Sequence, residues 1–312
     1  MPDPAMPDLP LTVRFSASEG AWDAWAPALQ AALPGMRLSR DGDPARFDAI
    51  IYAPGGDITD FTPYRNVRLV QSLWAGVERI VTNPTLTQPL ARMVDPGLAQ
   101  GMAEYCTGWA MRAHLGMDRY AQDGVWRHGQ IPPLAPARPV TVLGMGELGR
   151  ATAAMLTAIG FSVTGISASG RPVPGVTVQP VTALDQVLDT TQILICLLPD
   201  TPDTRNLLDA RGLSRLPKGS WIINPGRGTL IDDQALLRAL DQGRPAHAVL
   251  DVFRAEPLPA DHPFWAHPGI TVTPHIAAET RPATAAPVAA DNLRRAMAGQ
   301  PVRHLVDRAR GY

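Results

Sequence analysis

Short apolar runs rich in Val, Ile and Leu alternate with Ala- and Leu-rich stretches between Leu11 and about Thr273. The short runs are typical of buried parallel strands, and the longer stretches are typical of helices that cover a sheet. This alternation predicts a doubly wound α/β fold with parallel sheets.

The first hundred residues are expected to form a small flavodoxin-like sheet with a helix at Ala21–Leu33. A proline-free stretch, Gly97–Tyr120, then predicts one long helix that crosses between two domains. The strands of the first sheet are expected at Leu11–Phe15, Asp48–Ala53 and Arg68–Ser72.

A second set of strand-like runs follows a polar, proline-rich segment, residues 123–139. It contains about as many strands as a dinucleotide-binding sheet. After Pro282 the chain becomes helical again through Met297, and we expect this helix to return to the first domain. The six strands are expected at Val140–Leu143, Ser162–Ile166, Ile193–Leu198, Trp221–Asn224, Ala248–Phe253 and Ile270–Thr273.

We therefore expect two Rossmann/flavodoxin-like, doubly wound parallel-sheet domains with the active site in the cleft between them. Residues 1–98 and 284–312 should form a discontinuous substrate-binding domain, and residues 99–283 should form the dinucleotide-binding domain. The length of 312 residues suits two domains, and 45% hydrophobic with 18% charged residues is typical of soluble globular proteins.

The formal net charge of −1 gives no field strong enough to recruit nucleic acid or an anionic membrane, so small molecules or proteins are the expected partners. The segment Met1–Ala5 lacks the features of a secretion signal, and no apolar run approaches the roughly 20 residues of a membrane span. A cytoplasmic protein is predicted. Cys106 and Cys196 are expected to be buried thiols rather than a disulfide or a catalytic pair.

A glycine-rich turn follows the predicted strand Val140–Leu143 and precedes a predicted helix. Gly144 should permit the turn, Gly146 should let the backbone approach a pyrophosphate, and Gly149 should let helix and strand pack closely. This context predicts dinucleotide binding, against the alternative of a turn that binds nothing. The predicted contact residues are Gly144, Met145, Gly146, Glu147, Leu148 and Gly149.

The next strand ends in the sequence Ile166-Ser167-Ala168-Ser169-Gly170-Arg171, without the acidic residue that would bind the ribose of NAD. The hydroxyl groups of Ser167 and Ser169 and the guanidinium of Arg171 suit a 2′-phosphate instead. The hypothesis is a preference for NADPH, with NADH as a weaker alternative. The other interpretation is that Arg171 is a solvated loop residue.

Arg227, Glu256 and His275 each follow an apolar, strand-like run in the last third of the chain. A cation, a carboxylate and an imidazole at the carboxyl ends of neighbouring strands can hold a 2-oxo acid and protonate its carbonyl group. Gly226 and Gly228 are expected to leave the backbone of Arg227 uncrowded, so that its guanidinium grips a carboxylate. Each residue also has a simpler interpretation: a surface arginine, a solvated charge and a structural histidine.

The chain resembles the D-isomer-specific 2-hydroxyacid dehydrogenases over nearly its whole length. The likeness implies that Arg227 binds and polarises the substrate, that His275 is the general acid/base, and that Glu256 orients His275. It also implies a homodimer built mainly from the cofactor domains. The matching segments are Ser72–Val77, Gly144–Gly149, Leu198–Thr204, Asn224–Gly228, Leu250–Leu258, Thr273–His275 and Val306–Tyr312.

The same likeness implies further binding residues. The backbone N–H groups of Ala75, Gly76 and Val77 should bind the substrate carboxylate, and Trp74 before them is expected either to form a pocket wall or to pack in the core. The segment from Leu198 to Thr204 should line the ribose or phosphate side of the cofactor, unless it is only a turn. The further predicted cofactor contacts are Leu198, Pro199, Thr204, Pro225, Gly226 and Asp251.

The predicted reaction is the reduction of glyoxylate to glycolate or of hydroxypyruvate to D-glycerate, with NADPH as hydride donor and His275 as acid. Two alternatives stay open: a related dehydrogenase for larger 2-oxo acids, and a non-catalytic protein that senses the cofactor. Formate dehydrogenases resemble the chain less, because they carry an amide where Glu256 stands. No metal site is predicted, since His262 and His267 lack a closed ligand set.

Overall fold

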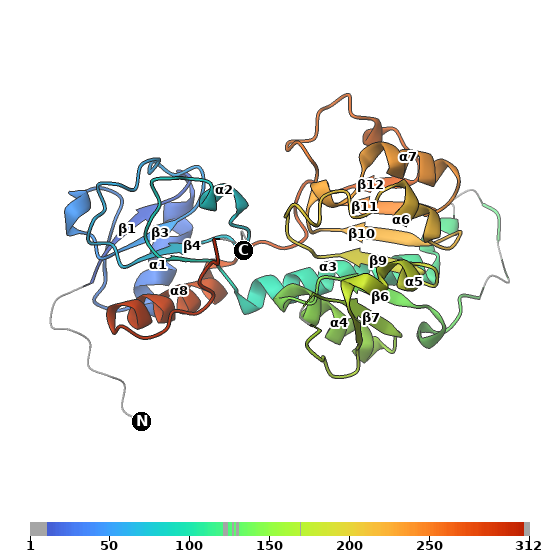
Figure 1. Ribbon diagram of the computed structural model, residues 1–312, viewed down its shortest axis with the longest axis horizontal. Coiled ribbons are helices and arrows are strands. Elements are labelled where there is room, and N and C mark those ends of the chain that lie inside the picture. Colours follow the sequence, from blue (N-terminus) through green and yellow to red (C-terminus); the bar gives the residue numbers. More distant parts are fainter. Residues whose placement is uncertain (1–10, 121–123, 127, 129–130, 169, 309–312) are drawn as a thin grey trace. The chain divides into compact units, whose positions relative to one another are not determined.

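The computed structural model describes residues 11–120, 124–126, 128, 131–168 and 170–308 (Figure 1). The chain divides into two compact units. Unit 1 is formed by the chain up to Leu98 and from Thr280 onward, and unit 2 is formed by Ala99–Glu279. The second boundary predicted from the sequence lies four residues later, between residues 283 and 284.

Unit 1 contains a five-stranded parallel sheet in the order β2-β1-β3-β4-β5. The helices α1 (Ala21–Ala32) and α8 (Pro282–Met297) pack against each other and against one face of the sheet, while α2 (Glu78–Val81) lies in the cluster on the other face. The last long helix is therefore part of unit 1. The strands are β1 (Thr12–Ser16), β2 (Arg37–Ser39), β3 (Ala49–Tyr52), β4 (Leu69–Ser72) and β5 (Leu90–Ala91).

Unit 2 contains a seven-stranded parallel sheet in the order β12-β11-β10-β9-β6-β7-β8. The strand order reverses at β6, which is the first strand of this unit and the one before the glycine-rich turn. The strands are β6 (Val140–Leu143), β7 (Val163–Ile166), β8 (Thr177–Gln179), β9 (Ile193–Cys196), β10 (Trp221–Asn224), β11 (His247–Leu250) and β12 (Ile270–Val272).

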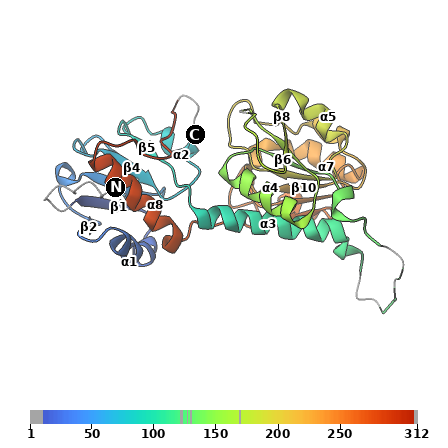
Figure 2. The ribbon, with the colours of Figure 1, turned by 90° about the horizontal axis from the view of Figure 1, so that it is seen from below.

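Helices cover both faces of this sheet, and in the inner strands alternate residues are buried in different clusters. Ile193 and Ile195 of β9 pack with α3 and α4, whereas Leu194 and Cys196 pack with α5, α6 and α7. Figure 2 shows α3 and α4 on the same side of the sheet. The helices are α3 (Pro96–Leu115), α4 (Glu147–Ile159), α5 (Leu184–Leu188), α6 (Ala210–Arg215) and α7 (Asp233–Asp241).

Single turns of 3₁₀ helix complete the described secondary structure. They lie at Pro44–Arg46, Met117–Arg119, Ala135–Ala137, Val181–Ala183, Gly228–Leu230 and Pro263–Trp265.

The structure confirms the doubly wound, parallel-sheet fold class and corrects some elements. The predicted helix Gly97–Tyr120 is wrong at its end: α3 stops at Leu115, because Gly116 adopts a left-handed conformation with φ 63°. The short strands β2, β5 and β8 were not predicted.

Both cysteines are buried and free, as predicted, and burial raises the pKa of Cys106 to about 12. No helix among the described residues is long and apolar enough to cross a membrane.

Candidate active site

The glycine-rich turn joins β6 to α4, and two of its glycines are required by close backbone contacts. Gly144 has φ 98°, and a Cβ atom there would lie 2.6 Å from the carbonyl oxygen of Leu197. A Cβ atom at Gly149 would lie 1.8 Å from the carbonyl oxygen of Gly144. By contrast, a Cβ atom at Gly146 would meet no atom within 4 Å. The first two glycines therefore serve the turn itself, whereas Gly146 borders open space.

The first turn of α4 presents backbone N–H groups at the carboxyl edge of the sheet. Gly146 is the N-cap residue and supplies no side-chain hydrogen bond, and the N–H group of Arg150 makes the first bond back to its carbonyl oxygen. The N–H groups of a helix's first turn carry partial positive charge and bind phosphate well. This end of α4 is therefore suited to a pyrophosphate.

The residues predicted to select NADPH follow β7. Ser167 is buried, and its backbone N–H group donates to the carbonyl oxygen of Gln179 in β8. Arg171 is exposed. Ser169 lies outside the described residues.

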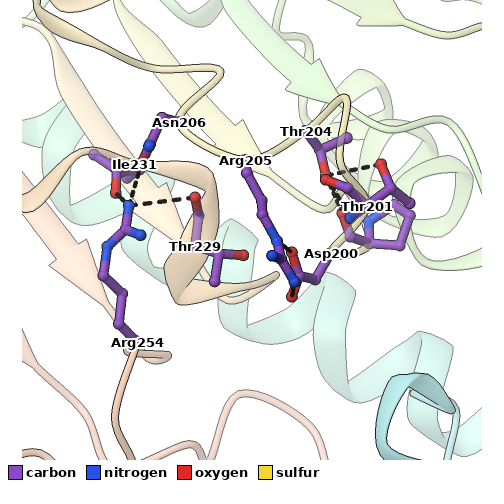
Figure 3. A network of polar contacts seen from close by, with 9 residues as sticks. Asp200, Thr201, Thr204, Arg205, Asn206, Thr229, Ile231 and Arg254 are labelled. Atoms are coloured by element: carbon purple, nitrogen blue, oxygen red, sulfur yellow. Dashed lines mark hydrogen bonds and ion pairs between the residues drawn. The ribbon is translucent and has the colours of Figure 1, made fainter. Parts of the chain in front are cut away.

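The loop after β9 is closed by the hydroxyl group of Thr204 (Figure 3). This hydroxyl donates to the carbonyl oxygen of Pro199 at 2.6 Å and accepts from the N–H group of Thr201 at 2.9 Å. Arg205 forms two hydrogen bonds with the carboxylate of Asp200, and this contact, together with the charge of Arg227, lowers the pKa of Asp200. Thr204 therefore shapes the loop, which was not expected from the sequence.

Glu256 and His275 come together at the carboxyl edge of the sheet. Nδ1 of His275 lies 2.8 Å from Oε2 of Glu256, and Oε1 of Glu256 accepts from the N–H group of Phe253 at 2.9 Å. The imidazole is 56% exposed and the carboxylate 37%. Because a carboxylate accepts from the Nδ1–H group, Nε2 is the ring nitrogen left to exchange a proton with a substrate.

The turn that carries His275 is fastened to Asp251, which follows β11 and is fully buried. One carboxylate oxygen accepts from the hydroxyl group of Thr273 at 2.6 Å and from the N–H group of Ile276 at 2.9 Å, and the other accepts from the N–H group of Ala277 at 2.9 Å. The hydroxyl of Tyr105 in α3 lies 2.7 Å from that of Thr273. The Asp251 carboxylate is thus engaged in holding this turn.

Arg227 follows β10 in an extended conformation and is half-buried. The amide nitrogen of Asn224 donates to the carbonyl oxygen of Arg227 at 3.0 Å, and Nη1 of Arg227 donates to the carbonyl oxygen of Gly226 at 2.7 Å. The side chain of the last residue of β10 therefore fixes the backbone that carries the guanidinium.

The expectation that Gly226 and Gly228 leave this backbone uncrowded is wrong. A Cβ atom at Gly226 would lie 2.7 Å from the carbonyl oxygen of Cys196, and one at Gly228 would lie 2.1 Å from the carbonyl carbon of Phe253. The glycines are needed because neighbouring backbone approaches them closely. This packing places the turn of Arg227 directly against the turn of Glu256.

A family model for the NAD-binding domain of D-isomer specific 2-hydroxyacid dehydrogenases matches residues 109–277. The chain belongs to this family. Glyoxylate/hydroxypyruvate reductase A of Serratia proteamaculans is 37% identical over 318 aligned residues, which cover 96% of this chain and 97% of that protein.

Two solved structures of proteins from other bacteria are also similar to this chain. A D-isomer specific 2-hydroxyacid dehydrogenase from Xanthobacter autotrophicus, in complex with NADPH and MES, is 36% identical with a TM-score of 0.91, covering 97% of this chain and all of that chain. An NADPH-dependent glyoxylate/hydroxypyruvate reductase from Sinorhizobium meliloti, in complex with NADP and sulfate, is 31% identical with a TM-score of 0.86, covering 98% and 100%.

In unit 1 of this dehydrogenase, the predicted substrate loop follows β4. The hydroxyl of Ser72 accepts from the N–H group of Trp74 at 2.9 Å, and it lies 3.0 Å from the carbonyl oxygen of the same residue. Trp74 is 43% exposed, so it does not pack in the core of unit 1. Ala75 and Gly76 are half-buried, and Val77 is buried at the start of α2.

Three residues of this site were not predicted from the sequence: Tyr105, Thr273 and Arg254, whose contacts join segments that are distant along the chain. Among the residues that the structure describes, no group of three or more His, Cys, Asp or Glu side chains is arranged to hold a metal ion.

Proposed function

We propose that this chain is an NADPH-dependent reductase of small 2-oxo acids, which converts glyoxylate to glycolate and hydroxypyruvate to D-glycerate. The observation that carries the proposal is the hydrogen-bonded pair of His275 and Glu256 at the same sheet edge as the uncapped first turn of α4. The name of the Serratia relative supports the substrates, and the NADPH-dependent Sinorhizobium reductase supports the cofactor.

The residues of unit 2 fit a dinucleotide in this proposal. The pyrophosphate would lie against the backbone of Gly144–Gly149, where the open space beside Gly146 leaves room for it. The segments Leu198–Thr204 and Pro225–Gly226, with Asp251, would border the rest of the cofactor. When bound, NADPH supplies the hydride.

Preference for NADPH over NADH is proposed from the end of β7. A carboxylate there would repel a 2′-phosphate, and residues 166–171 contain none. The guanidinium of Arg171 and the hydroxyl groups of Ser167 and Ser169 would bind the phosphate instead.

His275 acts as the general acid in this proposal. The carboxylate of Glu256 holds Nδ1–H and fixes the orientation of the ring. Nε2–H then donates its proton to the carbonyl oxygen of the substrate as that oxygen gains negative charge.

Arg227 is proposed to bind the substrate and to stabilise the negative charge that grows on the reacting oxygen. Its guanidinium keeps its charge at any physiological pH and carries several donors in one plane. The backbone N–H groups of Ala75, Gly76 and Val77 are proposed to bind the substrate carboxylate, with Trp74 as a wall of the pocket.

A homodimer built mainly from unit 2 is also proposed from the family likeness, and a cytoplasmic location is proposed as well. The molar mass of the protein in solution, measured by light scattering during size-exclusion chromatography, tests the dimer. A mass of twice the 33.4 kDa chain supports it, and the mass of a single chain rejects it.

The direct test of function is NADPH oxidation with a panel of 2-oxo acids. Turnover should be fastest with glyoxylate and hydroxypyruvate, and slower with aryl and branched substrates and with NADH. The reverse substrate order would favour the alternative of a dehydrogenase for larger 2-oxo acids. Tight NADPH binding without turnover of any 2-oxo acid would favour a cofactor-sensing protein, for which the described residues offer no separate support.

A further inference from the structure

Arg254 reaches from the turn that carries Glu256 to two other segments of unit 2, one at Asn206 and one at residues 229–233 (Figure 3). Its Nη2 donates to the side-chain oxygen of Asn206 and to the carbonyl oxygen of Ile231, and it lies 3.4 Å from the carbonyl oxygen of Thr229. Its Nε donates to the carboxylate of Asp233 at 3.2 Å. One guanidinium therefore contacts four acceptors, one at Asn206 and three within residues 229–233.

These two segments are hydrogen-bonded to each other and form a common base. The N–H group of Asn206 donates to the carbonyl oxygen of Thr229 at 2.9 Å, and that of Leu208 donates to the carbonyl oxygen of Leu230 at 3.1 Å. Leu208, Leu230 and Ile231 are at most 2% exposed. The 3₁₀ turn Gly228–Leu230 begins directly after Arg227, so this base includes the backbone that follows the proposed substrate-binding arginine.

The turn that contains Arg254 and Glu256 is exposed and lies outside any helix or strand. Residues 254–257 are exposed, and the chain from 251 to 262 contains no helix or strand. Among the described residues, the carboxylate of Glu256 is hydrogen-bonded to the N–H group of Phe253 within the same turn and to Nδ1 of His275. Arg254 thus links this exposed turn to the buried base.

The charge of Asp233 strengthens this link. Asp233 is the first residue of α7. The pKa of its carboxyl group is raised, because the effect of burial exceeds the opposing effect of the Arg254 charge. A half-buried carboxylate gains most from a hydrogen-bonded cation. His262 lies 4.0 Å from the same carboxylate, which is too far for a hydrogen bond.

We propose that Arg254 is a positioning residue that sets the place of the Glu256 carboxylate relative to His275 and to the turn of Arg227. It does so by fixing the turn Phe253–Glu256 onto Asn206, Ile231 and Asp233. The inference rests on the proposed function, since it assigns Arg254 to the same reaction. Arg254 acts through Glu256, and it touches neither substrate nor cofactor in this account.

A double-mutant cycle tests this dependence. Arg254→Gln should lower kcat by roughly 10- to 100-fold, because small misplacements of a catalytic group cost factors of this size, and should leave the KM for NADPH nearly unchanged. In a Glu256→Gln background, the same substitution should change kcat by no more than about twofold, because the interaction it serves is already lost. Equal effects in both backgrounds would overturn the proposal.

The matched control is Arg211→Gln, which removes another exposed two-point ion pair of unit 2, that with Asp185. It should change kcat by less than about twofold. In Arg254→Lys the charge beside Asp233 is kept, but a lysine side chain cannot reach all four acceptors. This variant should therefore fold, and its kcat should still be far below that of the wild type. Full activity of Arg254→Lys would show that charge alone suffices and would overturn the positioning role.

A measurement without turnover separates this inference from the proposed function. Hydrogen exchange of the peptide that contains residues 252–258 should become faster in Arg254→Gln and stay unchanged in Arg211→Gln. Unchanged exchange in Arg254→Gln would reject the inference even if the wild-type protein reduces 2-oxo acids. Faster exchange in a protein that reduces no 2-oxo acid would retain Arg254 as the anchor of the turn and reject the proposed function instead.

Discussion

The backbone N–H group of His275 donates to the carbonyl oxygen of Asp251 at 2.9 Å, while the carboxylate of the same Asp251 binds the residues on both sides of His275. His275 has φ 56°, a left-handed conformation that costs most residues about 1–2 kcal/mol. A buried carboxylate with three donors therefore holds the proposed acid in a conformation that the chain would not adopt by itself.

Replacing the carboxylate of Asp251 should destabilise the protein. In Asp251→Asn, an amide NH₂ group faces one of the three donors and leaves it without an acceptor, at a cost of about 1–3 kcal/mol. Urea denaturation measures the loss. Asp241→Asn, at a side chain that is 75% exposed, is the control and should stay within about 0.5 kcal/mol of the wild type. Equal stability of the two variants would contradict the role given to Asp251.

Two glycines of the same turn should respond differently to alanine. Gly149→Ala places Cβ 1.8 Å from the carbonyl oxygen of Gly144, so stability should fall by about 1–3 kcal/mol or more. Gly146→Ala meets open space at φ −73° and should leave stability unchanged. If a pyrophosphate lies beside it, NADPH binding should weaken about tenfold, or ~1.4 kcal/mol. Thermal melts and NADPH titrations of both variants decide the matter, and unaltered NADPH affinity of Gly146→Ala would argue against that placement.

The patterns that could be predicted are local ones. A strand, three spaced glycines and a helix follow one another directly in residues 140–159. The sequence alone therefore predicted this strand–turn–helix motif correctly. The strands β2, β5 and β8 escaped prediction because β2 and β8 each contain one apolar residue and β5 has only two residues, so none of them forms an apolar run. Gly116 ends α3 through its left-handed conformation, a property that the absence of proline did not indicate.

The sequence predicted the types of residue in the site, but not the contacts that hold those residues in place. Glu256 and His275 were predicted because each follows an apolar, strand-like run, and the structure brings these two side chains together. The crowding of Gly228 by Phe253, and the contact of Tyr105 with Thr273, need coordinates, since nothing in either local sequence refers to the other segment. The same holds for Arg254.

Arg171 should determine much of the cofactor preference. Arg171→Ala should reduce the ratio of kcat/KM with NADPH to that with NADH by roughly 10- to 100-fold, because a hydrogen bond to a charged group contributes about 1.5–3 kcal/mol. Turnover with NADH should be almost unaffected, which separates lost phosphate binding from general damage. If the ratio is the same as in the wild type, Arg171 is a solvated loop residue, as the alternative interpretation of the sequence holds.

Stability should fall as the pH falls below about 6.5. Burial, with the charge of Arg138, lowers the pKa of His114, whose Nδ1 accepts from Nε of Arg138 at 3.1 Å. The unfolded chain then binds more protons than the folded one, so the contribution is fully present above the ordinary histidine pKa and is lost below it.

Urea midpoints at about pH 7.5 and about pH 5.5 measure this dependence. The difference between them should shrink in His114→Gln and persist in His128→Gln, at an exposed histidine. It should not vanish, because burial also lowers the pKa of His247. A difference as large in His114→Gln as in the wild type would contradict the assignment.

The central claim, that His275 donates the proton in reduction of a 2-oxo acid, is tested most directly by His275→Ala with NADPH and glyoxylate. Loss of a general acid should lower kcat by about 10²- to 10⁴-fold. The affinity for NADPH, measured by titration without substrate, should stay close to that of the wild type, because His275 is not among the residues proposed to bind the cofactor. A variant that keeps most of the wild-type kcat would contradict the account.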